Sequence, residues 1–158
     1  MKAFLLNLVV AAIWVLLQAE TTFFAFATGL GLGFAMLALF RDVLGSRDYV
    51  RRVLAAAAFL LLFTKEFLTS CWQLIGAILW TPADQLCPRI ITYDISGLSR
   101  VEALLLSHCI SLTPGTTTVD ISPDLKRFTL HVLACRDPEA VRATLDRTLR
   151  RGILAFTR

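Results

Sequence analysis

Charged residues are scarce in this chain. Asp, Glu, Lys and Arg make up 18% of its 158 residues, and hydrophobic residues make up 56%. A water-soluble domain usually has about 25% charged and 45–50% apolar residues, so this composition excludes a disordered chain and a conventional soluble enzyme. The net charge of +4 is small and no long run of Lys and Arg occurs, which argues against a nucleic-acid partner.

The residue types that usually build metal, redox and catalytic sites are also few. The four cysteines are Cys71, Cys87, Cys109 and Cys135. They form no CxxC pair, which excludes a zinc ribbon or a thioredoxin-like motif. His108 is next to Cys109, but adjacent side chains on a helix point about 100° apart, so this is no catalytic pair. The sequence predicts no enzyme activity, no cofactor and no metal site.

What charge there is lies mostly in the second half. Residues 1–80 contain 6 Lys/Arg and 4 Asp/Glu, whereas residues 81–158 contain 10 and 8. The first half therefore resembles a membrane region and the second half an ordinary folded domain. We predict a membrane protein with an α-helical N-terminal membrane region and a small α/β C-terminal domain. The predicted parts are a transmembrane hairpin at 1–40, a basic loop at 41–52, a long amphipathic or membrane helix at 53–80 and an α/β domain at 81–158.

Two apolar segments form the predicted hairpin. They run from Ala3 to Ala19 and from Phe23 to Phe40, and each is near the lower limit for a helix that spans a bilayer. A cleaved signal peptide is the alternative for the first segment. We favour a retained hairpin, because Lys2 is a weak basic start, no AxA cleavage site follows, and the second segment comes at once.

The loop after the hairpin indicates its orientation. It carries Arg41, Arg47, Arg51 and Arg52, and the positive-inside rule places such a loop in the cytoplasm. The N-terminus and the α/β domain are then expected on the same side of the membrane.

Small residues recur along the second apolar segment. Ala25, Gly29 and Gly33 are four residues apart, so they fall on one side of a helix. Such a stripe lets helix backbones approach closely in lipid. A glycine-rich phosphate loop is the alternative, but it needs a preceding strand, which is missing here. We expect a helix-packing site.

The segment from Val53 to Trp80 allows two placements. It begins apolar and then contains Lys65, Glu66, Thr69 and Gln73 within about 100° of helical arc. The helix either spans the membrane with its polar face on protein, or lies along the cytoplasmic interface. Lys65 and Glu66 form a potential intramembrane charge pair with a role in transport. We favour the alternative of surface or subunit-interface charges, with Lys65 snorkelling.

The last 78 residues have the pattern of a β-α-β-β-α unit. Residues 89–95 form a predicted strand, and Ser99 with Glu102 forms a capping box that opens a helix reaching about Leu112. Alternation predicts two further strands, with Thr117, Val119 and Ile121 on one face of the first and Phe128, Leu130 and Val132 on one face of the second. Asp137 caps a final helix that has Pro138 at its first position.

A short loop connects the middle helix to its strand. In Thr113-Pro114-Gly115-Thr116 the proline blocks helix continuation, and the glycine is suited to a positive φ. The structural interpretation is a rigid helix stop. The functional interpretation is a loop that docks a neighbouring subunit through its threonines.

These features together resemble the E-type subunit of the multisubunit Na+/H+ antiporter, the complex also called Mrp, Mnh or Pha. The resemblance covers essentially the whole chain: two short apolar segments, a helix with Lys65-Glu66, the run SLTPGTTTVDISPD from Ser111 to Asp124, the strand FTLHVL, and the Asp137-Pro138-Glu139 helix start. It implies an accessory, non-catalytic subunit in a bacterial inner-membrane complex that exchanges protons for Na+ or K+. Its implied partners are the other subunits and the lipid bilayer. A stand-alone membrane-anchored module that binds a ligand or protein is the alternative.

Overall fold

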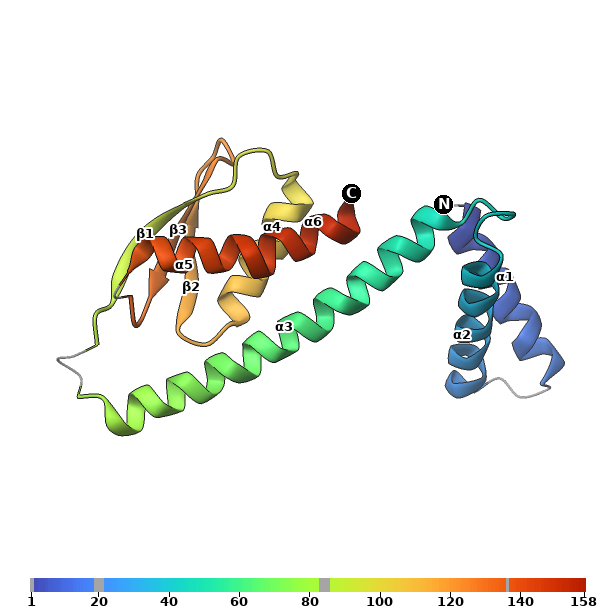
Figure 1. Ribbon diagram of the computed structural model, residues 1–158, viewed down its shortest axis with the longest axis horizontal. Coiled ribbons are helices and arrows are strands. Elements are labelled where there is room, and N and C mark those ends of the chain that lie inside the picture. The colour runs from blue at the N-terminus through green and yellow to red at the C-terminus, as the bar shows by residue number, and fades with distance from the viewer. Residues whose placement is uncertain (1, 19–21, 83–85, 136) are drawn as a thin grey trace. The chain divides into compact units, whose positions relative to one another are not determined.

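A computed structural model describes residues 2–18, 22–82, 86–135 and 137–158. The chain divides into two compact units, Met1–Leu54 and Ala55–Arg158. Figure 1 shows its elements in order, with helices at the N-terminal end and a small sheet with its helices in the C-terminal half. The chain is thus mostly helical, with one three-stranded sheet.

In the first unit two apolar helices pack against each other. They are α1 (Lys2–Leu17) and α2 (Phe23–Leu39), and the Thr22 side chain caps α2 by accepting from the Ala25 N–H. Residues 19–21, between the two helices in the sequence, lie outside the described residues. Large apolar side chains such as Leu5, Ile13 and Phe24 are exposed on the outer sides of the pair.

Helix α3 (Arg47–Trp80) has 34 residues and a length of about 51 Å. It begins six residues earlier than predicted, so half of the expected 41–52 loop is helical. The Val50 N–H donates to the Ser46 carbonyl, and Asp48 in the first turn suits the positive end of the helix dipole. By length and composition α3 could cross a membrane, whereas α1 and α2 are shorter apolar helices.

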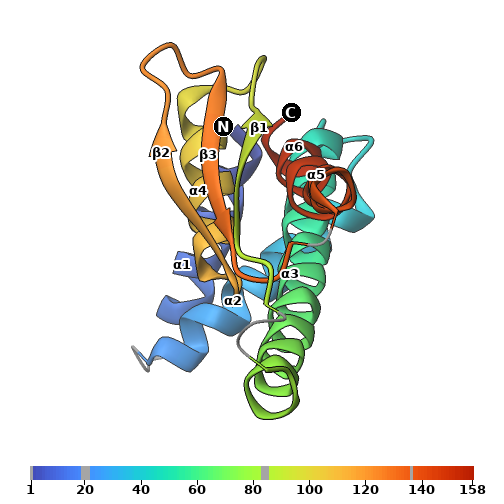
Figure 2. The same ribbon diagram turned by 90° about the vertical axis from the view of Figure 1, so that its left-hand side faces the viewer.

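The α/β domain follows the predicted β-α-β-β-α order. Its strands are β1 (Arg89–Asp94), β2 (Thr116–Ile121) and β3 (Arg127–Val132), arranged β1-β3-β2 with both pairs antiparallel. Helix α4 (Arg100–Leu112) connects β1 to β2 and opens with the predicted capping box at Ser99 and Glu102. Figure 2 shows α4 behind the three strands.

The C-terminal helix is interrupted by a π-helical turn. It consists of α5 (Pro138–Leu145), η2 (Asp146–Arg150) and α6 (Arg151–Thr157), with Asp137 as its N-cap. The turn presents Asp146 to the Tyr93 hydroxyl, which donates to it at 2.6 Å. Arg150 in the same turn donates to the backbone carbonyls of Asp94 and Ser96. These bonds fix the helix over the end of β1.

One apolar core joins the sheet to both helices. The sheet contributes Ile91, Tyr93, Phe128, Leu130 and Val132; α4 contributes Ala103, Leu106 and Ile110; and the C-terminal helix contributes Leu145, Leu149 and Ile153. Phe59 and Phe63 of α3 pack against this core, and the ring of Phe59 lies 5.5 Å from that of Phe156. Most of α3 is therefore part of the same unit as the α/β domain.

The prediction for β2 was wrong in one respect. A register shift between Thr118 and Asp120 interrupts its pairing with β3, so the strand does not alternate along its whole length. Val119 is 59% exposed instead of facing the core. The Thr118 hydroxyl points toward α4 and donates to the Ser107 carbonyl, so this bond replaces the expected apolar contact.

Candidate functional site

A pocket of about 350 Å³ lies between α3 and the α/β domain. Its α3 wall includes Glu66, Gln73 and Leu74, and its other walls come from residues 113–116, the end of β3 and the C-terminal helix. Two features singled out in the sequence, the acid at 66 and the loop at 113–116, thus lie on one cavity. No spacing pattern could have indicated this, since the two segments are about 50 residues apart.

The faces of α3 explain which of its residues reach the pocket. Phe59, Phe63, Glu66 and Leu74 lie within an arc of about 80°, because successive helical residues are about 100° apart. Glu66 is half-buried on this side, whereas Lys65 is exposed among the residues of the opposite side. The predicted polar face is therefore divided between two sides of the helix. No ion pair joins Lys65 to Glu66 within the described part of the chain.

The loop at 113–116 stops α4 and turns the chain into β2. Gly115 has φ +87°, the positive value expected from the sequence, and a Cβ atom there would meet open space. The Thr113 hydroxyl donates to the Cys109 carbonyl at 2.9 Å, and that of Thr116 donates to the Ile110 carbonyl at 2.7 Å. Both threonines therefore satisfy carbonyls at the end of α4, where the helix leaves them without partners.

The conformation of Gly115 makes its replacement costly. We expect Gly115→Val to reduce the stability of the protein by about 1–2 kcal/mol, because an L-residue at positive φ is strained. Thermal unfolding of the purified protein in detergent measures the change. Gly76→Ala is the matched control, because its Cβ would lie 3.8 Å from the Trp80 ring and a helical glycine gains by the substitution. Equal melting temperatures for Gly115→Val and wild type would contradict a rigid helix stop.

The stripe on α2 lies against α1. Gly29 and Gly33 are buried and Ala25 is half-buried. A Cβ at Gly29 would lie 2.9 Å from the Ala11 Cα atom, and a Cβ at Gly33 would overlap the Asn7 side-chain oxygen. The two helices therefore approach so closely that these positions accept no larger residue.

Sequence reasoning missed Asn7, the polar residue in this contact. Its side chain is 3% exposed, and its Nδ2 atom donates to the Tyr49 hydroxyl at 2.9 Å. Its Oδ1 atom is buried without a hydrogen-bond partner among the described residues and lies against Gly33. An isolated Asn inside an otherwise apolar segment was the available signal, because a buried amide in such a segment needs a partner.

No described cysteine or histidine side chain lines the pocket. The described residues contain no cluster of three or more His, Cys, Asp or Glu side chains that could hold a metal ion. Cys135 is fully buried, and burial raises the pKa of the half-buried Cys109 thiol, which makes it a poorer nucleophile. The His108 Nδ1 atom donates to the Leu104 carbonyl of its own helix at 2.7 Å.

Comparison with known proteins identifies relatives over nearly the whole chain. Residues 7–156 match the family model of the Na+/H+ ion antiporter subunit. The E-type Na+/H+ antiporter subunit of Alkalihalophilus pseudofirmus is 33% identical over 154 residues, which cover 98% of this chain and 97% of that protein.

Two solved complexes contain similar chains. One is the Mrp complex from Dietzia sp. DQ12-45-1b, with a TM-score of 0.51 and 25% identity over 65% of this chain and 94% of that chain. The other is an archaeal membrane-bound sulfane sulfur reductase, with a TM-score of 0.56 over 96% and 98% of the two chains; at 21% identity this likeness concerns the fold alone. The resemblance stated from the sequence is thereby confirmed: this chain belongs to the family of E-type subunits of the multisubunit Na+/H+ antiporter.

Proposed function

We propose that this protein is an accessory, non-catalytic subunit of a multisubunit antiporter that exchanges protons for a monovalent cation, Na+ or K+. One observation carries the proposal. Between Ala3 and Leu39 the sequence contains a single ionisable residue, Glu20, which belongs to the connection between α1 and α2. A path for protons or cations through a membrane needs ionisable or strongly polar groups at membrane depth. This hairpin offers a packing surface instead, and supports assembly of the ion-translocating subunits.

The hairpin is proposed to cross the membrane. The outer surfaces of α1 and α2 carry large exposed apolar side chains, among them Phe4, Leu16 and Phe24. Exposed apolar surface of this extent is stable only in contact with lipid or with other apolar helices. The close contact at Gly29 and Gly33 joins the two helices in a medium where burial from water gives no driving force.

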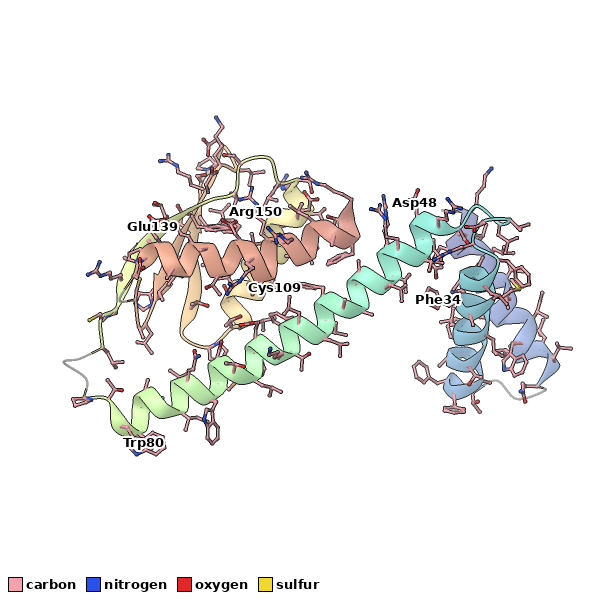
Figure 3. All side chains as sticks on the ribbon, in the orientation of Figure 1. Phe34, Asp48, Trp80, Cys109, Glu139 and Arg150 are labelled. Carbon is pink, nitrogen blue, oxygen red and sulfur yellow. The ribbon has the colours of Figure 1, made fainter. Side chains whose placement is uncertain are left out.

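Helix α3 is proposed to lie along the cytoplasmic interface of the membrane. One side of it, from Phe59 to Ala77, faces the α/β domain and the pocket. The opposite side is an exposed apolar strip of Leu54, Leu61, Leu68, Trp72, Ile75 and Leu79. Figure 3 shows Trp80 at the end of this helix, pointing away from the α/β domain. A helix covered by a charged domain on one side cannot be surrounded by hydrocarbon, whereas an interfacial helix needs only one apolar side.

This arrangement predicts that Cys87 lies in the cytoplasm. Cys87 is exposed, whereas the buried Cys135 is unsuitable as a probe. A variant that retains only Cys87 should not react with a membrane-impermeant thiol reagent in intact cells, and should react after the inner membrane is permeabilised. Reaction in intact cells would overturn the proposed topology.

Co-purification tests the assembly role. The wild-type protein, tagged and extracted from its native membranes, should retain the other antiporter subunits. The stand-alone binding module stays as a second candidate, because the pocket between α3 and the α/β domain has the volume of a small-ligand site. A protein that is stable, monodisperse and free of partners after mild extraction would favour the module.

A further inference from the structure

The Glu66 carboxylate has no positively charged partner among the described residues. It is half-buried in the wall of the pocket, and among the described residues none donates a hydrogen bond or forms an ion pair with it. Lys65 is adjacent in sequence but exposed on another side of the helix. No Lys, Arg or His lines the pocket in the part of the chain that the structure describes.

Four threonine hydroxyls around the pocket are already engaged. Thr113 and Thr116 donate to carbonyls of α4, Thr144 donates to the Ala140 carbonyl at 2.9 Å, and Thr148 donates to the Thr144 carbonyl at 2.7 Å. Each of these hydroxyls has one proton to donate, so these four are engaged elsewhere, and the other polar lining residues, Ser70 and Gln73, are neutral. No described residue supplies a positive charge to Glu66, so a counter-charge there comes from outside the described part of the chain.

Apart from Glu66, Ser70, Gln73 and the threonines, the lining is apolar. Leu74, Val132, Val141, Leu145 and Leu149 border the pocket together with the aliphatic ends of the threonines. A ligand that fills this space needs an apolar body and one positive charge. A lysine or arginine side chain has this form, because its methylene stem buries against apolar surface while its head keeps a charged partner.

We propose that the pocket receives a lysine or arginine side chain from another subunit of the complex, with its charged head at Glu66 and its stem along the apolar wall. The inference rests on the proposed function, since it requires a partner subunit. Glu66 then acts as an anchor for assembly and takes no part in proton transfer. Filling the pocket also removes from water the apolar surface that is left open in the isolated chain.

Charge variants of Glu66 test the proposal in the whole complex. The amount of the other subunits that co-purifies with the tagged protein should fall about tenfold or more in Glu66→Gln, and further in Glu66→Lys, because a buried cation loses its counter-charge. Glu66→Asp should recover part of the yield. Glu139→Gln is the matched control, because that carboxylate is on the neighbouring α5 but 80% exposed and outside the pocket lining.

Steric variants give a second, charge-independent test. Thr144→Phe should fill the pocket and also release the partner, whereas Ala143→Phe, one residue away, exposed and outside the pocket lining, should leave assembly unchanged. Melting temperatures of the isolated variants identify any that fail to fold.

The outcomes separate the two proposals. If the wild-type protein retains no other subunits, the proposed function fails. If the wild-type protein assembles and both Glu66→Gln and Thr144→Phe assemble equally well, the pocket does not receive the partner. Normal assembly combined with loss of a co-purified amine-bearing lipid in Glu66→Gln would assign the pocket to lipid and overturn the proposal. Normal complex levels with strongly reduced antiport in Glu66→Gln would instead assign Glu66 to transport.

Discussion

Gly29→Leu is expected to separate α1 from α2 and to abolish most assembly of the complex. A Cβ at position 29 would already lie 2.9 Å from the Ala11 Cα atom, 3.0 Å from the Ala11 carbonyl oxygen and 3.0 Å from the Trp14 Cβ atom. Two of these atoms are backbone and cannot rotate away, so the helices must move apart. Such overpacking costs about 1–3 kcal/mol, or roughly a five- to hundredfold shift in the packing equilibrium.

Gly31→Leu provides the matched control for this prediction. Gly31 is on the same helix but exposed, and a Cβ there would have no neighbouring atom within 4 Å. Both variants add the same side chain to the same apolar segment, so insertion into the membrane should be equal. The recovered complex and the antiport activity of membrane vesicles measure the effect. Equal losses in the two variants would show that volume in α2 matters in general and that the stripe has no special part in packing.

Glu102→Ala is expected to destabilise the α/β domain by about 2–3 kcal/mol, because several charge-assisted hydrogen bonds are lost together. Glu102 is 4% exposed. Its carboxylate accepts hydrogen bonds from Arg158 at 3.1 Å, from the Ser99 backbone N–H at 2.7 Å and from the Thr157 hydroxyl at 2.8 Å. One side chain therefore joins the start of α4 to the end of α6. Glu102→Gln keeps an acceptor for Ser99 and should lose less.

The same contacts make this contribution dependent on pH. The hydrogen bonds from Arg158 and then from Ser99 lower the pKa of Glu102 to about 2, from an ordinary value of 4.5. Because the folded state has the lower pKa, the stabilisation is complete above about pH 4.5 and disappears as the pH falls toward 2. The difference in stability between wild type and Glu102→Gln should therefore shrink over this interval.

Thermal unfolding of the purified protein in detergent, between about pH 3 and pH 7, measures this effect. Asp120→Asn is the control, because Asp120 is exposed on β2 and its replacement should change stability by less than about 0.5 kcal/mol. A constant difference between wild type and Glu102→Gln across this range would contradict the ionised role of Glu102.

Local rules predicted most of the elements. The capping box at Ser99 and the Asp137-Pro138 helix start are present, and so is the positive φ at Gly115, because each depends on residues within one turn of chain. Family membership could also be stated from the order of segments and the run from Ser111 to Asp124. The start of α3 was predicted too late, because clustered arginines are compatible with a loop and equally with the exposed first turns of a helix.

The apolar segments, most starts of helices and strands, and the family could all be inferred from the order of residues, because these properties depend on neighbours along the chain. Three findings needed the folded chain: Val119 is exposed beside the register shift, Asn7 lies against Gly33, and Glu66 borders the same pocket as the loop at 113–116. Each depends on contacts between segments far apart in the sequence. Packing geometry sets those contacts, and periodicity within one segment does not encode it.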